Sequence, residues 1–298
     1  MPSGLLELID TYNCDDACRE LLVDLRWPHG IACVRCGSTS VSALTTRTVF
    51  DCNDCSHQFS VTAGTIMHDT HLPLRKWFVA IYLMCESKKG VSAKQLERVL
   101  DVAYQTAWYL SHRIRKAMAN NPLEGPTLVG VVEVDETLVG GRAKGKGHGY
   151  RGNKFWVAGA IQRDGQVRLE HVPNIKKGTL QGFIGRNVSP DAEAVYTDEL
   201  RSYIGVGDTW EHHSVNHGGE QWVVGGVHTN SIEGVWSLFK RSLMGSFHKV
   251  SIKHIDRYLS ELEWRFNNRD NPRIFIDTLR RIVTTGAMPY AELTADAA

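Results

Sequence analysis

The segment 131–142 (VVEVDETLVGGR) most constrains the fold of this chain, because it places acidic residues inside an apolar run. The apolar residues on both sides of the acids have the composition and rough alternation of a strand, and a glycine pair ends the segment. Asp135 is therefore expected near the end of a buried strand. A lone aspartate there is as simply explained by a turn, so the interpretation needs support from other segments.

Two further segments supply that support. Residues 194–198 form another short apolar strand, which ends in Asp198. Residues 228–241 have helical spacing instead, with Asn230, Glu233 and Lys240 on a polar face and apolar residues opposite. Two aspartates at strand ends beside a polar helix face are the arrangement that a pair of divalent metal ions requires.

Length and composition are those of an ordinary globular protein. The 298 residues suffice for one sizeable core with one or two small modules, and 42% of them are hydrophobic. No apolar run approaches the length of a membrane span, and the N-terminus lacks a signal-peptide pattern, so a cytoplasmic protein without a membrane partner is expected. The net charge is only +1, but basic residues outnumber acidic ones in residues 61–120 and 236–281.

Four of the seven cysteines form two Cys-x-x-Cys pairs. Cys33 with Cys36 and Cys52 with Cys55 have the spacing of two zinc knuckles that together close one tetrahedral site, so one structural Zn²⁺ is predicted. The odd number of cysteines argues against a disulfide framework. A redox function of either pair is the alternative, although the surrounding sequence is not thioredoxin-like. A short helix is expected ahead of this module, within residues 5–25.

Residues 72–120 are predicted to form three helices, of which the second covers 93–100 and the third 107–118. A short helix, a brief turn and a longer basic helix are typical of a helix-turn-helix, whose last helix lies in a major groove of DNA. The predicted DNA contacts on that helix are Arg113, Arg115 and Lys116. The alternative is a plain three-helix bundle with a solvated basic face.

The region from about 127 to 290 is predicted to mix strands and helices. It begins with the strand of Asp135, followed by a glycine-rich basic loop that suggests contact with a phosphate backbone, although a merely solvated loop is as common. The basic residues of this loop are Arg142, Lys144, Lys146, Arg151 and Lys154.

The elements expected after this loop are a hairpin over 155–172, a helix over 179–188, the Asp198 strand, a strand near 212–215, the polar-faced helix and a helical tail over 254–284. This order predicts an α/β fold of the ribonuclease-H type, in which acidic residues from two strands and a late helix converge on one edge of a sheet.

Short segments along nearly the whole chain carry a resemblance to one family. They are 25–30 (LRWPHG), 33–37 (CVRCG), 64–66 (GTI), 106–108 (TAW), 133–136 (EVDE), 139–142 (VGGR), 197–199 (TDE), 215–217 (VNH), 228–236 (HTNSIEGVW), 240–241 (KR) and 265–269 (RFNNR). In these segments the chain resembles bacterial insertion-sequence transposases of the IS1595, or ISXO2-like, family.

The resemblance implies three parts: an N-terminal helix and zinc ribbon over 1–62, a helix-turn-helix over 63–122 and a ribonuclease-H-like catalytic domain over 127–290. It implies a DDE-type transposase that cuts and joins DNA strands at the ends of a mobile element. The implied partner is double-stranded DNA, both as terminal inverted repeats and as target. A homo-oligomer is expected in the synaptic complex, because two ends must be held together, and so is association with the bacterial nucleoid when DNA is bound.

The resemblance also assigns catalytic residues. Asp135 and Asp198 match the first two acidic positions of the family. At the third position the family commonly has Asn, followed by Glu and Lys, and these correspond to Asn230, Glu233 and Lys240. The family pattern favours Asn230 as the third ligand of Mg²⁺ or Mn²⁺, whereas the preference of such ions for anionic oxygen favours Glu233. Two catalytic ions are expected, with Lys240 at a phosphate and Arg241 among the DNA contacts.

Three neighbours of these residues receive lesser roles. Glu133 and Glu136 flank Asp135 and are expected on the opposite face of the strand, away from the metal ions. Trp236, on the apolar face of the late helix, is expected in the core. Two other functions remain open: a domesticated or inactive transposase-derived protein that only binds DNA, and a metal-dependent nuclease that hydrolyses without joining.

Overall fold

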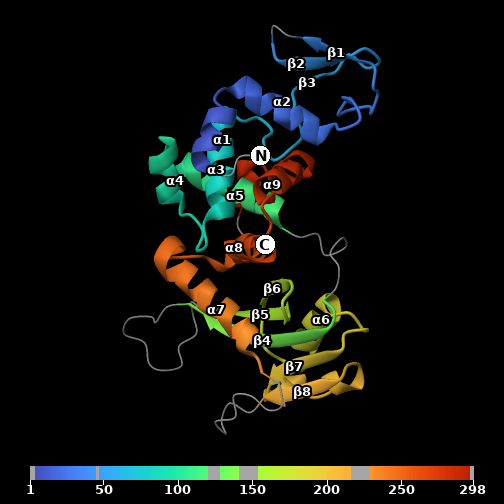
Figure 1. The fold of residues 1–298 in the computed structure, drawn as a ribbon, viewed down its shortest axis with the longest axis vertical. Coiled ribbons are helices and arrows are strands. Elements are labelled where there is room, and N and C mark those ends of the chain that lie inside the picture. Colours follow the sequence, from blue (N-terminus) through green and yellow to red (C-terminus); the bar gives the residue numbers. More distant parts are fainter. Residues whose placement is uncertain (1–3, 45–46, 120–127, 141–153, 216–227, 296–298) are drawn as a thin grey trace. The chain divides into compact units, whose positions relative to one another are not determined.

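The structure is a computed structural model, and the part of the chain that it describes comprises residues 4–44, 47–119, 128–140, 154–215 and 228–295. The chain divides into two compact units (Figure 1). The first unit consists of residues 1–119 together with 270–298, and the second consists of residues 120–269. Within the described residues, no helix combines the length and the hydropathy that a membrane crossing requires.

The first unit combines helices with a small antiparallel sheet of order β1-β2-β3. Its helices are α1 (Leu5–Thr11), α2 (Asp15–Arg26), α3 (Leu74–Glu86), α4 (Ala93–Leu100), α5 (Tyr104–Met118), α9 (Ile274–Thr284) and α10 (Tyr290–Thr294), and its strands are β1 (Val41–Leu44), β2 (Val49–Cys52) and β3 (Gln58–Phe59). The single helix expected within 5–25 is therefore two helices. The second of them is capped by the preceding residue, Cys14, whose sulfur accepts a hydrogen bond from the amide of Ala17.

The helix α9 completes the core of the first unit. Phe275 packs edge-on against Phe78 of α3 at 5.7 Å between ring centroids, and Cys85 and Thr278 share a hydrogen bond. The expected helical tail over 254–284 is thus two helices, since the chain leaves helical geometry between 268 and 273, where Pro272 disfavours it. The compact second unit accordingly ends at 269 and not at the expected boundary of 290.

The second unit is organised on a five-stranded mixed sheet of order β6-β5-β4-β7-β8 (Figure 1). The strands are β4 (Val131–Val139), β5 (Phe155–Gln162), β6 (Val167–Val172), β7 (Ala194–Asp198) and β8 (His212–Val215). The first three pair antiparallel, whereas β7 runs parallel to β4 and β8 parallel to β7. This topology, with helices on both faces, confirms the predicted ribonuclease-H-like α/β class.

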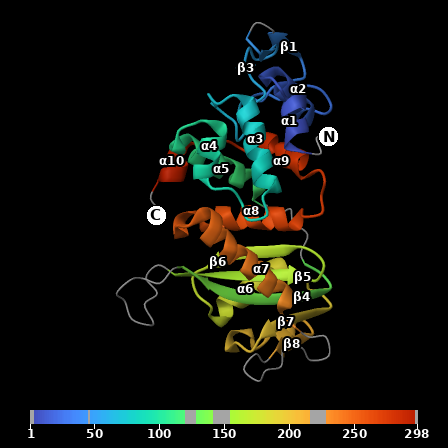
Figure 2. The same cartoon turned by 60° about the vertical axis from the view of Figure 1, so that its left-hand side comes forward.

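Two helical layers enclose this sheet (Figure 2). One face packs on α6 (Lys177–Asn187), η1 (Arg201–Tyr203) and η2 (Val206–Asp208), and the other on α7 (Asn230–Ser242) and α8 (Ile255–Asn267), which are connected through η4 (Leu243–Phe247) and η5 (Ile252–His254). The alternation of side chains along β4 decides which core each residue joins: Val132 and Val134 lie with α6, whereas Val139 lies with α7.

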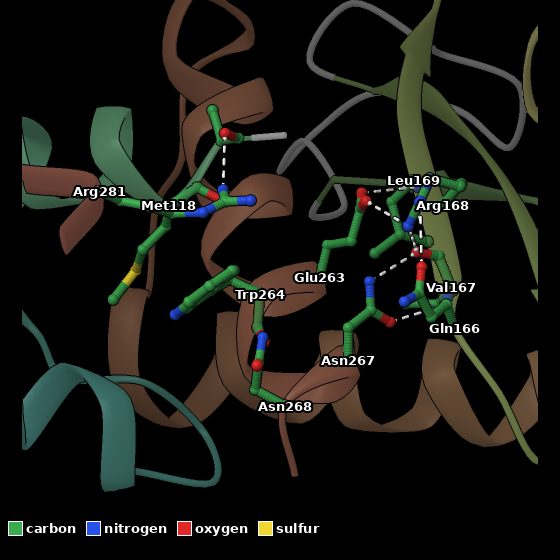
Figure 3. A network of polar contacts seen from close by, with 11 residues as sticks. Met118, Gln166, Val167, Arg168, Leu169, Glu263, Trp264, Asn267, Asn268 and Arg281 are labelled. Atoms are coloured by element: carbon green, nitrogen blue, oxygen red, sulfur yellow. Dashed lines mark hydrogen bonds and ion pairs between the residues drawn. The ribbon is translucent and has the colours of Figure 1, made fainter. Parts of the chain in front are cut away.

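The outer edge of the sheet is covered by side chains of α8 (Figure 3). Asn267 accepts a hydrogen bond from the amide of Val167 at 2.7 Å and donates one to the carbonyl of the same residue at 3.1 Å. Glu263 accepts from the amide of Leu169 at 3.1 Å. The amide side chain of Asn267 therefore makes the two hydrogen bonds that a neighbouring strand would make to Val167. These bonds pair the outward-facing backbone groups of that residue and fix α8 beside β6.

Candidate functional site

Three carboxylates converge where β4 and β7 lie side by side. Asp198 ends β7, and the pairing of β4 with β7 ends at Glu133, just before Asp135. Each of Asp135, Glu136 and Asp198 offers an oxygen that lies within 4.8 Å of the corresponding oxygens of the other two. The structure thus brings together the two predicted aspartates and adds Glu136, which was expected to point away from them.

The Asp135 carboxylate is held from the side of α7. The indole nitrogen of Trp236 donates a hydrogen bond to it at 2.8 Å. Gly159 pairs with Asp135 across the β4–β5 ladder, and a Cβ atom there would lie only 2.6 Å from the indole ring, so the glycine makes room for this contact. Burial raises the pKa of Asp135 to about 6, and the charge of Asp198 acts in the same direction. Trp236 is a core residue, as expected, that also orients a site carboxylate.

Glu136 leaves the opposite face of β4, as alternation requires, but it still reaches the cluster. It lies beyond Glu133, the last residue of β4 that pairs with β7, and its carboxylate lies with those of Asp135 and Asp198. The hydroxyl of Tyr203, which is 1% exposed, donates to its carboxylate at 2.6 Å. Burial raises the pKa of Glu136 to about 7, with further contributions from Asp198 and Asp135.

The prediction for Glu133 was wrong, because residues two apart in a strand share a face. Glu133 lies on the same side of β4 as Asp135, is 0% exposed and accepts hydrogen bonds from the first turn of α7. Its separation of two from Asp135 was the available signal. Tyr203 and Arg163, which hold Glu136 and Glu133, have no comparable signal in the sequence, because their positions follow from the tertiary fold.

The helix α7 carries both candidates for the third ligand on its exposed side near its start. Asn230 is its first residue, and Glu233 follows one turn later. The hydroxyl of Thr229 donates to the Glu233 carboxylate at 3.4 Å. The carboxylate of Glu233 is not one of the three clustered groups, but its charge raises the pKa of Asp135.

The acidic cluster has the chemistry of a site for a hard divalent cation. Carboxylate oxygens are the donors that Mg²⁺ and Mn²⁺ prefer. Burial and mutual repulsion hold the pKa values of Asp135 and Glu136 above their ordinary range, and a bound cation would relieve that repulsion. The residues therefore fit the predicted catalytic metal.

The four predicted zinc ligands also converge. The sulfurs of Cys33 and Cys55 are 3.7 Å apart, and those of Cys36 and Cys52 are 3.5 Å apart. A tetrahedron of thiolates with bonds of about 2.3 Å has edges of about 3.8 Å, so the four side chains fit one Zn²⁺. Beneath them Trp27, Phe50 and Phe59 form an aromatic cluster that joins this module to α2.

Arg113 and Arg115 of α5 are buried inside the first unit, contrary to their predicted contact with DNA, whereas Lys116 is partly exposed. Arg113 is 5% exposed, lies over the ring of Trp77 and donates to the carbonyl of His68 at 2.7 Å. Arg115 is 1% exposed and donates to Ser111. Lys116 donates to the carbonyl of Ala287. The basic side chains of α5 thus bond to neighbouring parts of the first unit. The spacing of basic residues in the sequence did not indicate that other elements surround this helix.

The remaining predicted DNA contacts have varied positions. Arg142, Lys144, Lys146 and Arg151 lie outside the described residues. Lys154 directly precedes β5 and is half-buried, whereas Lys240 and Arg241 are exposed in the last turn of α7.

Comparisons with known proteins agree with the order of these modules. Residues 127–267 match the family described as ISXO2-like transposase domain, and residues 14–58 match the transposase zinc-ribbon domain. Over 280 residues the chain is 30% identical to "Uncharacterized protein in transposable element ISH50" of Halobacterium salinarum, which covers 86% of this chain and 92% of that relative.

Two further similarities cover less of the chain or have lower sequence identity. An "Uncharacterized transposase-like protein" of Haemophilus influenzae is 37% identical over 101 residues, which cover 33% of this chain and 79% of that relative. Among solved structures, the Mos1 strand transfer complex matches with a TM-score of 0.30 and 14% identity, over 70% of this chain and 75% of that chain.

Proposed function

Since the chain belongs to the IS1595, or ISXO2-like, family of DDE transposases, we propose that it binds the ends of an insertion sequence and catalyses metal-dependent DNA cleavage and strand transfer. The observation that carries this proposal is the convergence of Asp135, Glu136 and Asp198 beside the start of α7. A purely DNA-binding descendant of such an enzyme would have no use for three carboxylates held in repulsive proximity.

In this proposal Asp135 and Asp198 hold the catalytic ions, and α7 supplies a third oxygen from Asn230 or Glu233. Two Mg²⁺ or Mn²⁺ ions, when bound, activate the attacking hydroxyl and stabilise the leaving 3′ oxygen of an in-line phosphoryl transfer. Trp236 keeps the Asp135 carboxylate turned toward the cluster. Tyr203 does the same for Glu136, which serves as an additional acceptor close to the reacting groups.

Positive charge for the DNA backbone comes from the other end of α7. Lys240 lies seven residues after Glu233 on the same exposed face, which corresponds to about 10 Å along a helix. At that separation Lys240, together with Arg241, suits a phosphate that neighbours the reacting one. Lys154 and the basic residues between 142 and 151 are proposed to follow the same backbone. Because two ends must be joined, we propose that the active species contains at least two copies of the chain, with one Zn²⁺ in each ribbon.

The experiment is strand cleavage of a labelled duplex that carries the element's own end, with Mg²⁺ or Mn²⁺. Native protein is compared with Asp198→Ala, Asn230→Ala and Glu233→Ala, and with Glu170→Gln as a control at an exposed ion pair. Asp198→Ala should lower the cleavage rate by at least about a hundredfold. The α7 variant that loses activity to a similar extent identifies the third ligand. Native protein that binds the end but does not cut it with either metal would overturn the proposal.

A further inference from the structure

Glu133 is a wholly buried carboxylate that the chemistry described above does not use. It lies on the same face of β4 as Asp135 and is 0% exposed. A charge withdrawn from water in this way is strongly unfavourable unless several donors compensate it. Its surroundings therefore indicate what the fold uses it for.

Donors from three directions meet both oxygens of Glu133. One oxygen accepts from the backbone amides of Ser231 at 2.8 Å and Ile232 at 3.2 Å. The other accepts from the Ser231 hydroxyl at 2.9 Å and from the guanidinium of Arg163 at 2.9 Å. The Nδ1 atom of His228 lies 3.3 Å from this second oxygen. Both oxygens of the carboxylate are thus engaged by the start of α7 and by Arg163, with His228 close by.

The two amides belong to the first turn of α7, whose N–H groups have no partner within the helix. The residue before the helix, Thr229, makes no capping hydrogen bond with its side chain. Glu133 supplies the cap from a different element, and its negative charge also suits the positive end of the helix. The start of α7 is therefore fixed to β4 rather than to its own preceding residue.

A second contact holds the same helix to the same strand. Trp236 donates to Asp135 at 2.8 Å, five residues after Ser231 meets Glu133. Of the candidates for the third metal ligand, Glu233 lies between these two contacts and Asn230 directly precedes the first of them. Arg163 adds to the fixation by donating to the carbonyl of His228 at 3.2 Å.

We propose that Glu133 is a positioning residue of the catalytic centre: it sets the start of α7, and hence the third metal ligand, relative to Asp135 and Asp198. This inference rests on the proposed function. Glu133 itself does not hold the ion, because both of its oxygens are engaged by α7 and Arg163 and it is not among the three clustered carboxylates.

The test is a double-mutant cycle that measures Mn²⁺ affinity of the zinc-loaded full chain by calorimetry. Glu133→Gln preserves the shape but places an amide group where Ser231 and Ile232 donate. It should weaken Mn²⁺ binding by about tenfold or more. In the background of the α7 ligand variant, Asn230→Ala or Glu233→Ala, the same change should have almost no further effect, since the ligand that it positions is already absent.

Glu170→Gln is the matched control, because it removes a carboxylate charge from an exposed ion pair elsewhere in the same unit. An unchanged Mn²⁺ affinity in Glu133→Gln would overturn the inference, and so would an equal loss in both backgrounds, which would indicate a general electrostatic or structural effect. If Glu133→Gln does not fold, Ser231→Ala removes one donor only and should still weaken Mn²⁺ binding, whereas native affinity in that variant would contradict the inference.

Failure of the proposed function has a different signature in these measurements. The native chain would then bind Mn²⁺ no better than Asp198→Ala does. Failure of the positioning inference alone would leave that difference intact while Glu133→Gln behaves like the control.

Discussion

Asp135 and Glu136 are adjacent in the chain, yet their side chains leave opposite faces of β4 and are held by different partners. Trp236 donates to the first and Tyr203 to the second. Burial raises the pKa of Asp135 to about 6 from an ordinary 3.8, and that of Glu136 to about 7 from an ordinary 4.5. Carboxyl groups that retain protons this close to neutrality must release them when a divalent cation binds.

The first prediction concerns pH and metal affinity. Because protons compete with the cation for Asp135 and Glu136, Mn²⁺ affinity should rise steeply between about pH 5 and about pH 7.5 and level off above the two pKa values. Calorimetric titrations across this range measure the effect directly. An affinity that is flat between these limits would contradict the assigned environment of both carboxyls.

The second prediction concerns the stability of the chain without the catalytic ion, which should fall, not rise, as pH increases. The folded chain binds more protons than the unfolded chain between about pH 4 and about pH 7, because both pKa values are raised on folding. The contribution of these groups to stability is complete below their unfolded pKa values and is lost as pH rises through the folded ones. Unfolding in magnesium-free buffer should show this loss for native protein, and it should be smaller in a variant with Asp135→Asn.

At the scale of single residues, the sequence predicted which residues carry the chemistry better than it predicted which side chains surround them. Asp135 and Asp198 were predicted because two apolar strands carry acids and a polar helix face follows them, although Asp135 lies in the middle of β4 and not near its end as predicted. The four cysteines were predicted because two pairs at this spacing are typical of a zinc site. Glu133 was assigned to the wrong face by an error of alternation, not by a lack of signal. The role of Glu136 depends on where β7 ends, which a single strand pattern does not contain.

Among the elements, α5 differs most from its predicted role. Its apolar and basic residues suggested an exposed recognition helix, but its two arginines, Arg113 and Arg115, are buried in the first unit. Arginine and lysine side chains have long apolar stems, so a basic helical stretch is compatible with burial when carbonyls and aromatic rings receive its charges.

The third prediction follows from this burial. Arg113→Leu removes a hydrogen bond to His68 and stacking on Trp77, so it should lower the free energy of unfolding by about 2 kcal/mol. The slope of the logarithm of DNA affinity against the logarithm of salt concentration should be the same in this variant as in native protein. A slope reduced by about one, with native stability in urea, would restore Arg113 as a phosphate contact.

The helix α8 has a structural role that its motif did not disclose. The segment 265–269 served only to carry the family resemblance, yet Asn267 makes two hydrogen bonds to Val167 at the sheet edge (Figure 3). The sequence predicted a helix in this segment, but not that one of its amide side chains would bond to the edge of a sheet.

The fourth prediction tests that role. Asn267→Ala removes the partner of the Val167 amide and one of the two donors to the Val167 carbonyl, which keeps its hydrogen bond from Arg168. The variant should lower the free energy of unfolding in urea by about 1–3 kcal/mol. Ser260→Ala in the same helix removes only an exposed hydrogen bond to Asp256 and should change stability little. Equal small losses in both variants would show that the edge of β6 does not depend on Asn267.

For the whole molecule, the order of modules was predictable and the division of the chain was not. Each module has its own local signal: cysteine pairs, helix caps, or apolar strands that carry acids. The return of α9 to the first unit depends on packing such as that of Phe275 on Phe78, between residues almost two hundred positions apart, and a local pattern does not specify its partner. The second unit is the contiguous part of the chain, and it contains all the proposed catalytic residues.

The most direct test of the transposase function is strand joining with a pre-cut element end, because joining separates a transposase from a nuclease. The substrate is a duplex that ends in a 3′-hydroxyl, its control ends in a 3′-deoxy nucleotide, and the target is a supercoiled plasmid with Mg²⁺ or Mn²⁺. Native protein should join the hydroxyl end and not the deoxy end, and Asp198→Ala should join neither. Native protein that binds the end but yields only hydrolysed plasmid, or joining that survives Asp198→Ala, would contradict this function.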